Sequence, residues 1–156
     1  MSLALPRRSF LATVAAGLLG AGAPALAQPR KTPVALAGSE AATAPELTRA
    51  LEAAVLEELA HTDSVRLVPE NRAAFRLRAS VTSLETRRRG ADEHLLCAVS
   101  VLVEDRRTGA MRAVLEGRAR AEGPLGSVDR ESVVRAAVHG ALRPIATALG
   151  VPGHRG

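Results

Sequence analysis

The chain has 156 residues, of which 47% are hydrophobic and 24% are charged, and it carries a formal net charge of +5. Only 1% of the residues are aromatic, and the sequence contains no Trp and no Tyr. Stacking on bases or sugars requires aromatic faces, so we expect no nucleic acid partner and no aromatic binding platform.

The first 27 residues have the three parts of a cleaved export signal: a basic start, an apolar middle and an exit of small residues. The residues that define it are Arg7, Arg8, Phe10, Leu11, Ala25 and Ala27. The paired arginines resemble a twin-arginine signal, and the Ala- and Gly-rich middle favours that route. General secretion stays open, because Pro6 stands where a Ser or Thr is more usual.

We expect no stable membrane anchor after cleavage. The apolar stretch covers about 13 residues, short of the roughly 20 that span a bilayer core. The protein is therefore predicted to be periplasmic or secreted from a bacterium. Removal of the signal, which contains two arginines and no acidic residue, lowers the formal charge from +5 to +3. This small basic excess suits an anionic partner in the cell envelope.

The rest of the chain has the length of one domain. We expect residues 28–44 to form a linker with a candidate first strand at 34–37, residues 45–149 to form an α+β domain, and residues 150–156 to form a flexible tail.

A helix is predicted to begin near Thr43 and to end near Ala60 or His61. Thr43 can cap it, and Pro45 is tolerated in a first turn. Apolar residues then recur every four positions, which is typical of an amphipathic helix. They are Leu47, Leu51, Val55 and Leu59.

Four further strands are predicted, at residues 64–68, 75–82, 95–104 and 111–122. Apolar and polar residues alternate in the second and the fourth of these, as in strands with one buried face. The segment 95–104 is apolar on both faces, with Leu96, Ala98 and Leu102 on one of them, so we expect a central strand covered on both sides. Residues 87–93 are predicted to be a polar loop. Residues 105–109 are predicted to be a hairpin turn in which Gly109 supplies a positive φ.

A last helix is predicted to begin after a cap at Ser127 or Asp129 and to end at Gly150, with a kink or loosening caused by Pro144. The order is β-α-β-β-β-β-α. We expect a parallel first β-α-β step, an antiparallel meander of the next three strands, and both helices on one face of a mostly antiparallel sheet. This is a two-layer α+β fold.

Cys97 is the only cysteine and cannot form an internal disulfide. Its apolar neighbours favour a buried, inert thiol, although pairing between chains stays open.

Two segments carry a resemblance to a known group of proteins. They are Phe-Arg-Leu-Arg-Ala-Ser-Val at 75–81 and Val-Leu-Val-Glu-Asp-Arg-Arg-Thr-Gly-Ala at 101–110. With the element order, they make residues 33–149 resemble the small periplasmic domain of curli-secretion lipoproteins and penicillin-binding-protein activator lipoproteins, and more distantly the amino-terminal domain of the Tol-system translocation protein. The resemblance implies a binding or assembly module acting on envelope proteins without catalysis. The chain departs from the lipoproteins in having no lipid-attachment cysteine near the signal exit.

The sequence contains no catalytic signature. The histidines are His61, His94, His139 and His154. No serine lies in a nucleophile elbow, no second ligand stands at a metal-site spacing from a histidine, and there is no Gly-rich phosphate loop. We therefore predict a protein that is not an enzyme and has no metal site or cofactor.

Arginines are the candidate binding residues. Four are expected on the polar faces of two strands, and they are Arg76, Arg78, Arg118 and Arg120. They form either a solvated face balanced by Glu116 and Glu122 or a docking face, since guanidinium groups suit carboxylate and phosphate partners. The arginines at 87–89 and 106–107 are expected at opposite ends of the sheet, and so not in one site.

The leading hypothesis is an exported adaptor or binding domain that engages an envelope protein or an anionic envelope component. The alternative is a carrier or sensor that holds a small ligand between helices and sheet.

Overall fold

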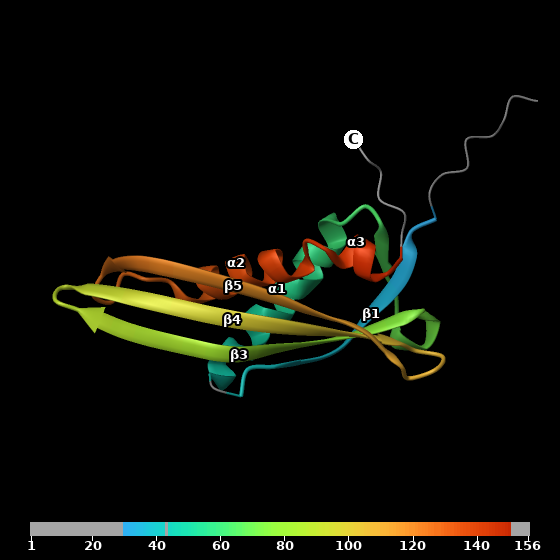
Figure 1. The fold of residues 1–156 in the computed structure, drawn as a ribbon, viewed down its shortest axis with the longest axis horizontal. Helices are drawn as coiled ribbons and strands as arrows, with labels where there is room; N and C mark the ends of the chain where they lie inside the picture. Colours follow the sequence, from blue (N-terminus) through green and yellow to red (C-terminus); the bar gives the residue numbers. More distant parts are fainter. Residues whose placement is uncertain (1–29, 43, 151–156) are drawn as a thin grey trace, which may run out of the picture.

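The computed structural model describes residues 30–42 and 44–150. It contains a curled five-stranded sheet with helices on one side (Figure 1). The strands are β1 (Thr32–Glu40), β2 (Val65–Leu67), β3 (Phe75–Arg89), β4 (Asp92–Asp105) and β5 (Met111–Pro124). The helices are η1 (Pro45–Leu47), α1 (Thr48–His61), η2 (Glu70–Arg72), α2 (Arg130–Leu142) and α3 (Ile145–Ala148). The predicted α+β class and element order are confirmed. The predicted signal, the Thr43 cap and residues 151–156 of the predicted tail lie outside the described residues.

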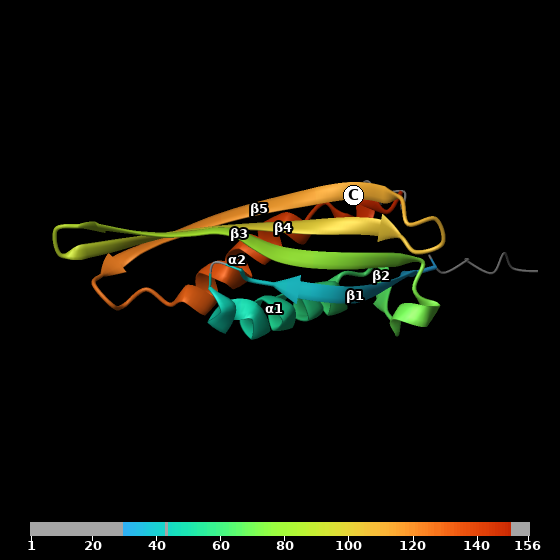
Figure 2. The ribbon, with the colours of Figure 1, turned by 90° about the horizontal axis from the view of Figure 1, so that it is seen from below.

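The strand order in the sheet is β2-β1-β3-β4-β5. Strand β1 pairs in parallel with both β2 and β3, and β3, β4 and β5 form the predicted antiparallel meander. The long strands lie side by side in front of the helices in Figure 2. Strand β1 covers Thr32–Glu40, longer than the expected 34–37, because it pairs along both of its edges.

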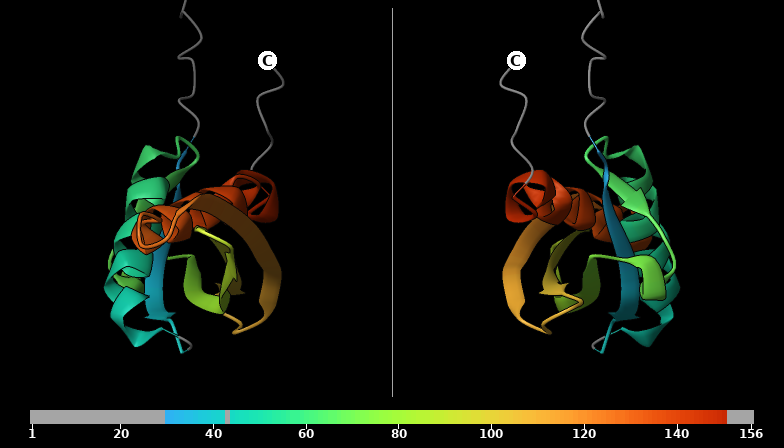
Figure 3. Two further views of the ribbon diagram at one scale, coloured as in Figure 1. Left: turned by 90° about the vertical axis from the view of Figure 1, so that its left-hand side faces the viewer. Right: turned by 90° about the vertical axis from the view of Figure 1, so that its right-hand side faces the viewer.

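Both α1 and α2 cover the same face of the sheet, as predicted, and they cross it next to each other (Figure 3). The apolar stripe of α1 is buried there, and so is that of α2. From β4 the core receives the buried side chains of Leu95, Cys97, Val99, Val101 and Val103. Burial raises the pKa of the Cys97 thiol, in keeping with its predicted role as a small core hydrophobe.

Two predictions about β4 and its neighbours are wrong. Among the described residues, no second layer covers the face of β4 opposite the helices, because both helices lie on one side, and Leu96 is 38% exposed. The segment 87–93 is not a loop. The ladder between β3 and β4 continues to Arg89 and Asp92, so that only Gly90 and Ala91 turn the chain, with Gly90 at φ 66°.

The last helix is divided at Pro144. Asp129 is its cap, and its carboxylate accepts hydrogen bonds from the backbone N–H groups of Glu131 and Ser132. Helix α2 ends at Leu142, and α3 starts directly after Pro144 instead of continuing through a kink. Since proline has no N–H to donate and its ring crowds the preceding turn, the break lies where its position predicts it.

A candidate docking face on the sheet

The sheet face that points away from the helices is called the open face here. Alternation along the paired strands assigns to it the residues Arg76, Arg78 and Ser80 of β3, Leu96, Ala98, Ser100 and Leu102 of β4, and Val114, Glu116, Arg118 and Arg120 of β5. Figure 2 views the molecule from this side, with the helices behind the sheet. All four predicted arginines therefore lie on one face.

A bulge in β3 decides which residues join this face. The register with β4 shifts between Val81 and Ser83, and the hydroxyl of the extra residue, Thr82, donates to the carbonyl oxygen of Ala98 at 3.2 Å. A bulge moves all later side chains to the opposite face. Arg87 consequently lies opposite His94, on the open face. The sequence held a signal for this shift that we did not use. The apolar residues of the strand have odd numbers up to Val81, and the next one, Leu84, has an even number.

The four arginines do not form one continuous row. Arg76 pairs with Glu70 at 3.2 Å, and Arg78 lies 3.9 Å from Glu104. Arg118 and Arg120 lie farther along the sheet and have no ion-pair partner among the described residues.

Register gives the separation of the two pairs of arginines. Arg78 lies opposite Leu102 of β4, and Arg118 lies opposite Ala98. At the usual rise of about 3.3 Å per residue, these two β4 positions are about 13 Å apart.

Apolar side chains are exposed beside these arginines, which sequence reasoning missed. Leu96 is 38% exposed, Val114 is 49% exposed and Met111 is 65% exposed. Register places Val114 opposite Leu102, and Arg120 opposite Leu96. The row Ser80, Ser100 and Glu116 lies between these two apolar parts of the face. Exposed apolar side chains beside arginine are typical of protein–protein interfaces. A solvated face needs no such apolar side chains.

Two shallow hollows lie on this face, one at each apolar part. One has a volume of about 560 Å³ and is lined by Gly38, Arg78, Ser80, Ser100 and Leu102 among others. The other has a volume of about 350 Å³, lies on the β3–β4 hairpin that projects past the helices in Figure 1, and is lined by Arg87, Arg88, Arg89, His94, Leu96 and Arg120 among others. Both open to solvent, and each can receive a side chain or loop of a partner.

Acidic residues alternate with the arginines at the hairpin end of the face. Arg87 pairs with Glu85 at 2.8 Å, and His94 Nδ1 lies 3.3 Å from Glu122. The face is therefore mixed in charge and not uniformly basic. Interleaved charges give register and specificity to a protein partner, whereas a polyanion is attracted by a continuous positive surface.

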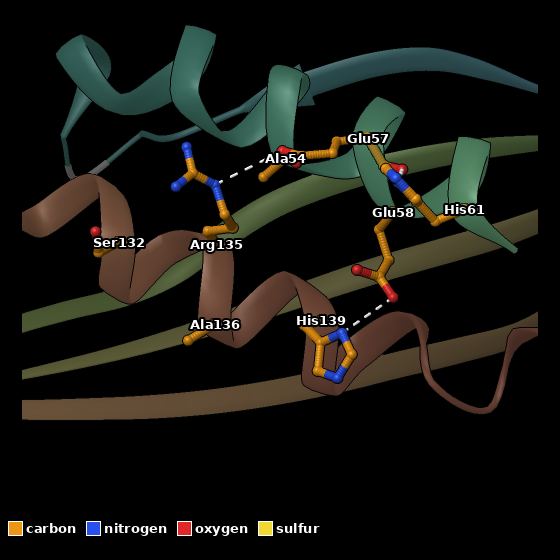
Figure 4. A pocket seen from close by; sticks show the side chains of 8 residues that line it. All are labelled: Ala54, Glu57, Glu58, His61, Ser132, Arg135, Ala136 and His139. Atoms are coloured by element: carbon orange, nitrogen blue, oxygen red, sulfur yellow. Dashed lines mark hydrogen bonds and ion pairs between the residues drawn. The ribbon is translucent and has the colours of Figure 1, made fainter.

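A third hollow, of about 430 Å³, lies between the two long helices on the other side of the molecule (Figure 4). Its lining includes Ala54 and Ala136, and two cross-helix pairs flank it. Arg135 Nε lies 3.7 Å from Glu57, and His139 Nδ1 lies 3.0 Å from Glu58. It lies between the helices and not between helices and sheet, where the carrier hypothesis places a ligand. The space under the helices is filled by the core.

The histidines that the structure describes serve local structure. His61 Nδ1 lies 2.7 Å from the carbonyl oxygen of Glu57, at the end of α1, and the other two form the pairs with Glu122 and Glu58. Within residues 30–42 and 44–150, no three metal-ligating side chains come together, and no helix is long and apolar enough to span a membrane. His154 lies outside this part.

Comparison with known proteins gives a fold and no family. No protein-family model matches the chain, and no curated protein matches its sequence. Among solved structures, the PelC dodecamer from Paraburkholderia phytofirmans matches with a TM-score of 0.54 and 16% identity, covering 74% of this chain and 86% of PelC. A variant of the same protein matches with a TM-score of 0.55 and 16% identity, covering 76% and 90%.

A weaker match is the lipoprotein GNA1162 from Neisseria meningitidis, with a TM-score of 0.43 and 13% identity, covering 76% of this chain and 99% of that one. We base no conclusion on that score. The chain thus has the fold of PelC, a bacterial protein. The finer resemblances to curli-secretion and Tol proteins stay predictions.

Proposed function

We propose that this protein is a non-catalytic binding domain of the bacterial cell envelope, and that an envelope protein docks on the open face of its sheet. The observation that carries the proposal is the exposure of apolar side chains at two parts of that face, Leu96 opposite Arg120 at one and Val114 in the same row as Arg78 at the other. Burying such side chains against a partner is favourable by about 25 cal/mol per Å² of apolar surface.

A protein partner explains the face better than an anionic polymer does. The charges alternate in sign and the two hollows are separate. A folded protein can be complementary to this surface in both shape and charge. Location in the periplasm is part of the proposal, and the predicted export signal supports it. No catalytic role is proposed, since the described histidines bind neighbouring backbone or carboxylate groups.

The proposal is tested by cross-linked capture from native cells, using the full-length protein with a tag and a matched pair of charge reversals. Arg78→Glu changes the open face. Arg49→Glu changes an exposed arginine of α1, in the other layer. We expect an envelope protein that is captured by the wild type and by Arg49→Glu and is lost with Arg78→Glu. Equal capture by both variants would contradict docking on the open face.

A further inference from the structure

The two edges of the sheet differ greatly in length. Strand β2, at one edge, has three residues, whereas β5, at the other, has 14. Among the described residues, no strand pairs with the outer edge of β5. A long free edge exposes backbone N–H and C=O groups that can pair with another strand, and proteins usually shorten or block such an edge.

The charges along β5 are self-complementary. Its open-face residues include Val114, Glu116, Arg118 and Arg120 in that order. If a second β5 is laid antiparallel to the first, with a two-fold axis at Gly117, Glu116 of each copy lies opposite Arg118 of the other. Val114 of each copy then lies opposite Arg120 of the other, whose methylene stem can cover it.

Neighbouring registers are less favourable. A shift of two residues in either direction keeps the faces matched but places Arg118 opposite itself or Glu116 opposite itself. Directly opposed like charges are destabilising across a strand pair, and opposite charges are stabilising. The charges along β5 therefore favour one register of the strand pair. Charges that served only to prevent association of two edges would favour no register.

The helix side of the same axis has room for a second copy. Gly117 lies beneath α2, and Gly140 of α2, close above it, is exposed. Ala136, one turn earlier, is exposed as well. Small residues at these positions let two α2 helices approach each other over the joined sheets. In the same register Leu115 lies opposite Ala119, which extends the apolar core across the axis.

We propose that two copies of this chain associate edge to edge through β5, in antiparallel register with a two-fold axis at Gly117, to form one continuous sheet. A two-fold contact of this kind is isologous, so the same surface serves both subunits. The inference goes beyond the proposed function and does not rest on it, because it concerns backbone pairing at the edge of the sheet, although Val114, Arg118 and Arg120 also belong to the open face.

Charge exchange tests the register. The mass of the purified protein is measured by sedimentation equilibrium for the wild type, Glu116→Arg, Arg118→Glu and the double variant. We expect a dimer for the wild type, a dissociation constant raised about tenfold or more in each single variant, and recovery in the double variant, which restores both pairs with exchanged signs. A wild-type monomer at about 100 µM, a larger assembly that the single variants leave unchanged, or no recovery in the double variant would overturn the proposal.

A covalent test does not depend on ion pairs. In the variant with both Val114→Cys and Arg120→Cys, each new thiol faces a thiol of the other copy, while the two in one chain are too far apart along the strand to be linked. Oxidation is expected to give a covalent dimer, whereas Val114→Cys alone gives none, and Cys97 is buried. Equal yields from the two variants would overturn the proposed register. Circular dichroism establishes that each variant is folded.

Discussion

Gly117 of β5 lies directly beneath Ala137 of α2, and a β-carbon on Gly117 would collide with the carbonyl oxygen of Ala137. The helix therefore rests on the strand backbone at this point. Contact with backbone, unlike contact with a flexible side chain, cannot be relieved by a rotamer change. The close approach holds α2 down on β4 and β5.

Gly117→Ala should therefore destabilise the protein by about 1–3 kcal/mol, because the added methyl group forces α2 away from the sheet. The matched control is Gly38→Ala in β1, where a β-carbon meets open space and φ is not positive. The measurement is the free energy of unfolding in urea. If Gly117→Ala were as stable as Gly38→Ala, the helix would not rest on this strand.

Adjacent leucines of β4 test whether only one face is covered. Leu95 is 1% exposed and Leu96 is 38% exposed. We expect Leu95→Ala to cost about 2–5 kcal/mol of unfolding free energy through loss of burial and a cavity. Leu96→Ala should cost under about 1 kcal/mol, as a substitution on the surface does. Similar losses from the two substitutions would mean that a second layer covers the open face.

Two carboxylates at the protein surface should make the fold sensitive to acid. Backbone hydrogen bonds, chiefly from Thr108, lower the pKa of Asp105 in the β4–β5 turn. The hydroxyl of Ser132, with backbone N–H groups, lowers the pKa of Asp129 at the start of α2. A carboxyl group with a lowered pKa binds fewer protons in the folded state than in the unfolded state. Its stabilisation is therefore present above the ordinary value near 3.8 and is lost as pH falls through the lower folded value.

The double variant Asp105→Asn with Asp129→Asn removes both titrations. The new amide oxygen at position 105 can accept both backbone bonds that Asp105 Oδ1 accepts, whereas at position 129 one of the two backbone bonds is kept. The urea midpoint of the wild type should fall more than that of the variant between about pH 5 and about pH 2. Parallel pH profiles would show that these two groups do not couple folding to pH.

The export route can be tested on the signal itself. Replacing both Arg7 and Arg8 by Lys keeps the charge but removes the paired arginines of a twin-arginine signal. We expect the precursor to accumulate inside the cell, and the exported wild type to begin at Gln28. Undiminished export of the variant would assign the protein to general secretion.

The sequence predicted the elements better than it predicted their surroundings. Period-two alternation and a four-residue stripe identify strands and helices because they reflect which side faces the core. They could not show that β1 enters the sheet between β2 and β3, since that pairing depends on backbone contacts between distant segments. The apolar outer residues Leu96 and Leu102 looked like core residues, because a docking face and a buried face have the same composition in a single strand.

The bulge at Thr82, which the sequence analysis did not predict, caused the larger error in the candidate site. It reverses the phase of β3, so that Arg87 shares the open face with Arg118 and Arg120 instead of occupying a loop. A single inserted residue changes no local propensity, and only the break in apolar alternation marks it. The location of all four predicted arginines on one face followed from alternation alone, whereas their separation into two pairs required the register.

The central claim is that the open face of the sheet, and not the helix layer, receives the partner. Leu96 on the open face and Leu56 on α1 form a matched pair, 38% and 36% exposed. The captured envelope protein is titrated into each variant, Leu96→Gln or Leu56→Gln, and calorimetry measures the dissociation constant. The two constants compare the two faces directly. We predict that Leu96→Gln weakens binding about tenfold or more, as loss of an apolar side chain buried against a partner does, and that Leu56→Gln binds like the wild type. Weakened binding by Leu56→Gln alone would place the partner on the helices and contradict the account.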